Sequence, residues 1–322
     1  MSYGQDVSIG VCFQNSFGTS QVNSVYHISH ISEAFAVAKE QIITQGMRGI
    51  YDEGEHYEGK NMNEGEFEAE IHPISLGVLL KAMFGDPVSV TSGAIYNHTF
   101  KPRTTDFDEF AASDPVTIAK DMGDAGSGHL YYDMVANTLG LSIANGELLK
   151  ATQAFVGGSY EQASALAASY PLGNDHFVWD ASSITFGGSA QPDMLNVSVS
   201  IEEGLEAKYG FDTTKTPYRV KRTGFRVINI EGTMLFINQN EYQEFLSQTK
   251  RSAVIHCKGP TEIQSGYYDE LTIDIPNLLV TENKPVAGGP GQIEVPLVAK
   301  AVYHPGSATA IAFTLQNTQA AY

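Results

Sequence analysis

Four glutamates at every second position are the residues whose spacing most directly suggests a chemical role. Glu64, Glu66, Glu68 and Glu70 alternate with glycine, phenylalanine, alanine and isoleucine. Successive side chains of a strand point to opposite faces, so this segment places four carboxylates on one face and apolar groups on the other. Such a row is either a solvated outer face or the negative wall of a water-filled passage for a polyanion.

A second group of acids lies in the polar segment 101–115. Asp106, Asp108 and Glu109 carry the oxygen ligands that hard cations prefer. The segment lacks the glycine and the terminal glutamate of a calcium-binding loop. We therefore expect a solvated loop and no metal site.

No other set of residues predicts catalysis or cofactor binding. His27 and His30 are three positions apart, but a metal site would need more donors nearby than these two histidines. The glycine-rich segments 123–128 and 288–291 do not join a strand to a helix, as a phosphate-binding loop does. Because no nucleophile–base pair emerges either, we predict no catalytic, cofactor or metal residue and no enzyme activity.

The charge balance limits the class of partner. The chain has 19 Lys and Arg against 37 Asp and Glu, a net charge of −18. Tight binding of a nucleic acid requires clustered basic residues, and only short Lys-Arg pairs occur in this sequence. A strongly acidic protein would instead allow DNA to pass without adhering.

Cysteine usage and the N-terminal segment suggest where the protein is made. Cys12 and Cys257 lie in distant segments, so we expect two reduced thiols, which suits a cytosolic origin. The first ten residues lack a basic and an apolar leader region, and no run approaches the roughly 18 apolar residues of a membrane span. We expect synthesis and assembly in a cytoplasm and no membrane anchor.

The elements that would position the glutamates are strands followed by a helix. Residues 48–71 predict two strands with a turn near Glu58–Gly59–Lys60. A helix should begin at Pro73 and end before Gly85, with one apolar stripe formed by Leu76, Leu79, Leu80 and Met83.

The remaining segments favour strands. Alternating patterns predict strands near 95–100, 116–121, 129–142 and 147–157 and again near 197–201, 271–275, 293–297 and 311–315. A second helix, about 240–248, should begin with an asparagine cap and bury Tyr242, Phe245 and Leu246. Residues 1–22 predict a polar arm that needs a partner to become ordered, and 23–50 predict either a helix or an irregular edge segment.

The chain contains two segments that resemble each other in sequence. EGEFEAEIHPISLGVLLKAMF at 64–84 and EGTMLFINQNEYQEFLSQ at 231–248 both lead from an extended segment into a short helix, and Tyr-Tyr-Asp follows at 131–133 and 267–269. We therefore predict a mainly β fold of two tandem antiparallel β-sandwich or barrel units, each with one flanking α-helix. Residues 1–157, including the arm, would form the first unit and residues 158–322 the second.

These segments resemble a known family in their order and spacing. The run from RGIYDEGEHYEGKNMNEGEF to LLKAMFGD, then YNHTFKP at 96–102, is similar to the first half of bacteriophage tail tube proteins, also called major tail proteins. NVSVSIEEGLEAKYGF, EYQEFLS and the closing ATAIAFTLQNTQAAY resemble the second half. The likeness covers the chain from about residue 20 to its end.

The resemblance implies a structural virion protein of the tail. Subunits of this family close into rings, and the rings stack into a tube that carries genome DNA to the host. It implies rings of three two-unit chains, or alternatively six chains, with a tape measure protein and tail terminator or tip proteins as partners. On this basis Glu64, Glu66, Glu68 and Glu70 become candidate lumen residues, and Asp106, Asp108 and Glu109 a candidate loop for contacts between subunits or rings.

Two other functions stay open at this point. One is a distal tail or baseplate ring adaptor of the same fold, which would form a single ring instead of a tube. The other is a carbohydrate-binding β-sandwich or adhesin, which would need exposed aromatic platforms. We expect Trp179 and the paired tyrosines at 131–132 and 267–268 to lie in the core or on sheet faces, which disfavours the carbohydrate-binding alternative.

Overall fold

The computed structural model describes residues 4–46, 51–103, 115–123, 128–164, 166–171, 175–211, 213–237, 239–286, 289 and 291–322. Across these residues the chain consists mainly of antiparallel strands with two α-helices, which confirms the predicted class of secondary structure. Neither of these helices is long and apolar enough to cross a lipid bilayer.

The elements follow the chain in this order. The first half of the described chain contains a 3-10 helix η1 (Gly4–Asp6), helix α1 (Pro73–Phe84) and strands β1 (Ser8–Phe13), β2 (Tyr26–Ile28), β3 (Ser32–Glu33), β4 (Ala36–Ile43), β5 (His56–Glu70), β6 (Val88–Ser92), β7 (Ile95–Phe100), β8 (Val116–Asp121), β9 (Gly128–Ala144) and β10 (Lys150–Ala163). The second half contains helix α2 (Asn240–Ser247) and strands β11 (Val178–Phe186), β12 (Ser189–Ala190), β13 (Met194–Glu202), β14 (Leu205–Lys208), β15 (Arg219–Arg222), β16 (Val227–Leu235), β17 (Lys250–Gln264), β18 (Tyr267–Asn283), β19 (Glu294–Ala301) and β20 (Ala312–Asn317).

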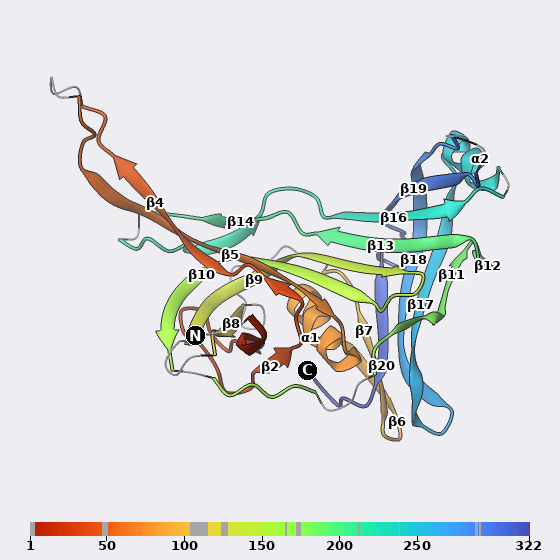
Figure 1. Ribbon diagram of the computed structural model, residues 1–322, viewed down its shortest axis with the longest axis horizontal. Coiled ribbons are helices and arrows are strands. Elements are labelled where there is room, and N and C mark those ends of the chain that lie inside the picture. Colours follow the sequence, from red (N-terminus) through yellow and green to blue (C-terminus); the bar gives the residue numbers. More distant parts are fainter. Residues whose placement is uncertain are drawn as a thin grey trace.

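Two long strands, β9 and β18, organise the large sheet (Figure 1). One edge of β9 pairs with β10, and the other edge pairs first with β8 and then with β13. Strand β18 is arranged in the same way, with β17 on one edge and β20 followed by β19 on the other. Both strands carry the Tyr-Tyr-Asp sequence. The repeated sequence therefore occurs in the two strands that pair with two successive partners along one edge.

Hydrogen bonding joins the two halves of the chain closely. The expected boundary between residues 157 and 158 lies inside β10, which continues to Ala163. Strand β7 of the first half pairs with β20 of the second, and β9 pairs with β13. The division into two units stays a prediction.

Helix α1 begins and ends where the sequence predicts. Pro73 is its first residue, and the side chain of the N-cap His72 accepts a hydrogen bond from the Ile74 backbone N–H at 3.2 Å. Gly85 ends the helix with φ of 84°, a conformation that favours glycine. The predicted stripe of Leu76, Leu79, Leu80 and Met83 is buried in the main core.

The C-terminal residue packs directly on this helix. A Cβ atom at Gly77 would lie 2.0 Å from the Tyr322 ring, so glycine is required at this contact. Lys81 Nζ donates a hydrogen bond to the main-chain oxygen of Tyr322 at 2.5 Å. Burial of the Tyr322 ring raises the pKa of its hydroxyl, which therefore stays protonated.

Strand β5 corrects the predicted strand pair at 48–71. It runs unbroken from His56 to Glu70, so the turn predicted near Glu58–Gly59–Lys60 is wrong. Its partner is β4, and residues 36–43 are strand, so the helix alternative for 23–50 is wrong as well. Glycine at position 59 allows β4 and β5 to approach closely, because a Cβ atom there would lie 3.0 Å from the Glu40 side chain.

The N-terminal segment is part of the core. Strand β1 pairs with both β2 and β8, and Ile9 and Val11 are fully buried. Gln14 is fixed by Asp133, because each donates one hydrogen bond to the other, at 2.9 and 2.7 Å. The prediction that residues 1–22 become ordered only with a partner is therefore wrong for this part of the segment.

Helix α2 lies where expected but differs in detail. Its N-cap is Gln239, whose side chain makes no capping hydrogen bond, so the predicted asparagine cap is wrong. Leu246 is 56% exposed instead of buried, while Phe245 packs against the core. An ion pair between Arg251 and Glu244, at 2.8 Å, links the helix to β17 and supplements its limited apolar contact.

Both cysteines are free and buried, as the sequence predicts for reduced thiols. Burial raises the pKa of the Cys12 thiol and raises that of Cys257 to about 11. Since the thiolate is the reactive form, both side chains are chemically inert in the folded protein.

Deleting residues 1–15 should prevent stable folding, because β1 and its pairing with two strands would be lost. Truncating one buried isoleucine alone typically costs about 2–5 kcal/mol. Deleting residues 1–4 leaves β1 intact and is the matched control. Thermal unfolding followed by circular dichroism measures the difference, and a wild-type melting temperature for the longer deletion would contradict the role of β1.

The Asp269→Asn substitution should stabilise the protein at neutral pH. Burial, with the negative charge of Asp175 as the second cause, raises the pKa of Asp269 to about 6 from an ordinary value of 3.8. The folded state therefore binds a proton more readily than the unfolded state, and the ionised carboxylate destabilises the fold above pH 6 by up to about 3 kcal/mol.

The advantage of Asp269→Asn should shrink as the pH falls from 6 to 4, where the wild-type carboxyl becomes neutral in the folded state. Asp274→Asn, an exposed position on the same strand, is the control. Denaturant unfolding at several pH values measures both variants. An equal effect of Asp269→Asn at pH 4 and pH 7.5 would contradict the assignment.

Candidate functional site

Strand β5 places four glutamates on one face of the sheet. The alternate residues Phe67 and Ala69 are buried, 1% and 0% exposed, and point toward the core. The glutamates all remain accessible to solvent, which confirms the predicted alternation along the strand. We call these residues the acidic row: Glu64, Glu66, Glu68 and Glu70.

The acidic row is stable only while it stays hydrated. Alternate residues of a strand lie about 7 Å apart, where two unit charges in water repel by about 0.6 kcal/mol. Across the strand pair, Lys150 faces Glu70. The pKa of Lys150 is raised mainly by its hydrogen bond to Glu147 and that residue's charge, with smaller contributions from Glu68 and Glu70.

The same face continues across the neighbouring strands. Strands β5, β10, β9, β13, β16 and β19 lie in register, so residues on one side form rows that cross the sheet. Small and polar side chains dominate these rows. One row consists of Glu68, Thr152, Gly140, Ser200, Asn229 and Lys300, and the next of Glu70, Lys150, Ser142, Ser198, Glu231 and Val298. We call this surface the polar face.

The opposite side of these strands is the hydrophobic core. Phe67 packs against Phe35 and Phe155, with ring centroids 6.4 and 6.2 Å apart. Helix α1 lies on this side, below β5, β9 and β10 in the view of Figure 1. The polar face is therefore the side of the sheet that α1 does not cover.

One end of the polar face is bordered by the β14–β15 hairpin. Val135, Val156, Leu205 and Val220 form a small apolar cluster under this hairpin. A cavity of about 680 Å³ lies beside the cluster, and its lining includes Glu64, Glu66, Glu40 and Glu206. The hairpin thus ends the open surface and contributes Glu206 to this lining, while its other charged residues are basic: Lys208, Arg219, Lys221 and Arg222.

A buried ion-pair cluster holds the base of the hairpin. The carboxylate of Glu203 is 2% exposed and pairs with Arg226 at 2.6 Å and with Arg222. Arg222 also donates a hydrogen bond to the Glu203 main-chain oxygen at 2.8 Å. The two arginines share this one carboxylate, so the cluster serves structure and keeps a net charge of about +1.

The polar face is suited to exclusion, not to catalysis. Among the described residues, no group of three or more His, Cys, Asp and Glu side chains could hold a metal ion. Hydrated carboxylates beside hydroxyl and amide groups offer a smooth anionic surface. Such a surface repels a polyanion that moves past it.

The other residues singled out in the sequence do not join this surface. His27 is buried on β2, where burial lowers its pKa, and its ring packs against Tyr170. His30 is exposed. Asp106, Asp108 and Glu109 lie outside the described residues, so their expected role stays a prediction.

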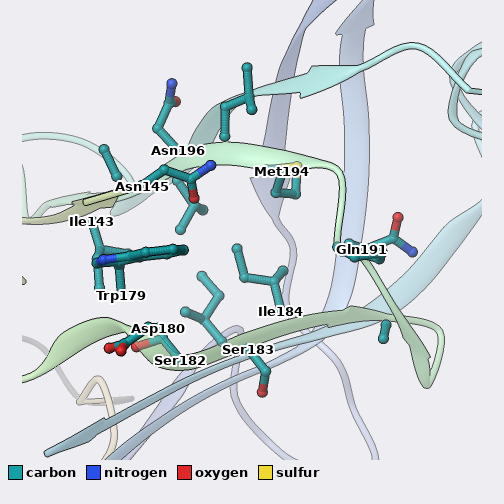
Figure 2. A pocket seen from close by; sticks show the side chains of 16 residues that line it. Ile143, Asn145, Trp179, Asp180, Ser182, Ser183, Ile184, Gln191, Met194 and Asn196 are labelled. Carbon is teal, nitrogen blue, oxygen red and sulfur yellow. The ribbon is translucent and has the colours of Figure 1, made fainter. Parts of the chain in front are cut away.

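Trp179 lies on strand β11 and outside the core, so of the two positions expected for the aromatic residues it takes the one on a sheet face. Its side chain is 46% exposed and lines a pocket between β11 and the start of β13 (Figure 2). By contrast, Tyr131 is buried, as expected. Tryptophan in a strand gives no local signal of which edge of a sheet it will occupy, so sequence reasoning missed this pocket.

Comparison with known proteins gives one match. A family model described as phage tail tube protein matches residues 4–301 of the 322-residue chain. The matched region includes the acidic row, α1, α2 and nearly the whole polar face. A search of curated proteins found no match.

The Glu203→Gln substitution should destabilise the protein by about 3–5 kcal/mol, because it leaves two largely buried arginines without their shared charge partner. Glu206→Gln is the matched control, since its pairing with Lys208 is exposed and such pairs contribute about 1 kcal/mol or less. Equilibrium unfolding in urea measures both. Equal stability of the two variants would show that the cluster does not anchor the hairpin.

Proposed function

The chain belongs to the phage tail tube protein family, whose members are structural proteins of the tail and not enzymes, and on this basis we propose that its copies close into rings that stack into the tube for genome DNA. In this proposal the polar face lines the lumen. The observation that carries it is the wide, hydrated and acidic sheet surface on the side away from α1.

The charge of the polar face supports passage without binding. Duplex DNA carries one negative charge per about 1.7 Å of its length, so a channel wall on which basic residues outnumber acids would retain it. Besides the two register rows given above, a third contains Glu66, Ala154, Thr138, Glu202 and Val227. Across these three rows of described residues there are five glutamates and two lysines, which favours repulsion.

Open strand edges support ring closure. Within the described residues, β4 pairs only with β5 and β6 only with β7, so each leaves one edge unpaired. All five residues of β6 are exposed and uncharged, a combination that invites pairing with another chain. Head-to-tail contacts between copies would cover such edges and, where the rotation closes, form a ring.

The number of chains per ring follows from the unit organisation. If residues 1–157 and 158–322 are two equivalent units, three chains give a ring of six units; otherwise six chains are needed. The mass of an isolated ring separates these cases. A tape measure protein inside the lumen and terminator or tip proteins at the ends complete the proposed assembly, with Asp106, Asp108 and Glu109 proposed at contacts between rings.

A distal ring adaptor of the same fold is the alternative. An adaptor would stop at one ring, whereas a tube subunit polymerises. Electron microscopy of the concentrated protein therefore separates the two functions.

Reversing charge in the acidic row should make assembled tubes retain DNA. We expect the triple variant Glu66→Lys, Glu68→Lys, Glu70→Lys to fold and assemble, because these side chains point away from the core. Its tubes should trap a short labelled duplex on a filter, and higher salt should release the duplex as phosphate contacts weaken.

The triple Glu→Gln variant at the same positions is the control, and it should retain far less DNA. Nuclease treatment tells where the duplex lies, since DNA inside the lumen is protected. Retained DNA that nuclease digests fully would place the acidic row on the outside of the tube and contradict its proposed position.

A further inference from the structure

The β4–β5 ribbon, residues 36–43 and 56–63, projects from the body of the protein (Figure 1). Ile42 lies directly opposite Tyr57 in the register, and these side chains are 55% and 54% exposed. Ile43 is exposed as well. A two-stranded ribbon is marginally stable in water, and exposed apolar side chains along it add to that cost unless something covers them.

Two hydrogen bonds at its base fix the direction in which the ribbon projects. The Asn61 N–H donates to the Lys215 main-chain oxygen at 2.9 Å, and the Tyr209 hydroxyl donates to the Asn61 oxygen at 2.8 Å. These bonds fasten its base to the loop that joins β14 and β15. A projection fixed in this way loses little conformational entropy when it docks.

The Trp179 pocket is a largely apolar hollow that no side chain of the described residues fills. It has a volume of about 330 Å³, and Ile143, Ile184, Met194 and Ile255 form much of its wall. Figure 2 shows the Trp179 ring extending between Asn145 and Ser182 toward Ile184. The volume is at the lower end of ligand pockets, so it suits one or two side chains.

The wall of this pocket is irregular in its backbone pairing. The register between β11 and β17 is interrupted between Val178 and Ser183, so Trp179 and its next three residues are outside the regular ladder. Asp180 and Asn145 flank the indole (Figure 2), and neither side chain has a hydrogen bond among the described residues. Polar groups at the rim of an apolar hollow are typical of a contact surface.

The ribbon and strand β11, which lines the pocket, lie toward opposite ends of the longest axis of the molecule (Figure 1). A head-to-tail contact requires two different, complementary surfaces on each copy. Building on the proposed function, we propose that the β4–β5 ribbon of one copy lies against the next copy and places Ile42 and Tyr57 in its Trp179 pocket. This contact would give the assembly its direction and fix the distance between neighbouring copies.

Trp179 is the only tryptophan of the chain, so its fluorescence reports on the pocket directly. On assembly of the full-length protein we expect a blue shift of its emission and reduced quenching by acrylamide. The double variant Ile42→Asp, Tyr57→Asp should fold but lose both changes and form no tubes. Val286→Asp, at another highly exposed apolar position, is the matched control and should assemble.

A cross-link tests the contact itself. Mixing the variants Tyr57→Cys and Gln191→Cys under mild oxidation should give a disulfide-linked dimer, because Gln191 lines the pocket. The two native thiols are buried and do not compete. Each variant oxidised alone is the control and should stay monomeric on a denaturing gel.

The outcomes separate this inference from the proposed function. Tubes that form with unchanged Trp179 fluorescence would overturn the ribbon contact and leave the tube function intact. Wild-type protein that stays monomeric at high concentration would overturn the function itself. Saturable quenching of Trp179 by a panel of soluble oligosaccharides, with no change on assembly, would replace the ribbon by a sugar as the occupant.

Discussion

One face of strand β5 must be buried in the core while the other stays in contact with solvent. This requirement determines how the neighbouring strands and α1 are arranged. Phe67 belongs to an aromatic cluster with Phe35 and Phe155 and must be covered by the core. The acidic row on the other face cannot be covered, because burying an unpaired carboxylate costs far more than an apolar contact contributes. The polar surface therefore extends over the strands in register with β5, and α1 packs on the opposite side.

This part of the fold could be predicted because its signals are local. The alternation from Glu64 to Glu70 depends only on strand geometry, and the stripe of α1 depends only on helix periodicity. Pro73 and Gly85 mark the ends of that helix through their own backbone preferences. Each of these predictions needs no knowledge of a partner segment, and each agrees with the structure.

The remainder depends on pairing between distant segments, which no short pattern encodes. Ser8–Phe13 resembles a loop in isolation and becomes a core strand because β2 and β8 flank it. Gly59 favours a turn until pairing with β4 holds it in a strand. Thr152 and Ser200 look like ordinary strand residues, and only the register of several strands makes them part of one polar face. The exposure of Trp179 is decided in the same way, by an irregularity between β11 and β17.

Separation of charge from apolar surface is what a hollow assembly requires. A net charge of −18 makes copies repel one another at a distance, and salt screens this repulsion beyond about 8 Å. Apolar contacts act only at close range, so they stabilise a joint without attracting other anions. Acids at such a joint would lose water, whereas acids on the polar face keep it if that face borders a solvent-filled lumen. Tyr57 donates a hydrogen bond to the carboxylate of Glu55 at 2.8 Å, so this acid has to stay hydrated at the rim of the proposed ribbon contact.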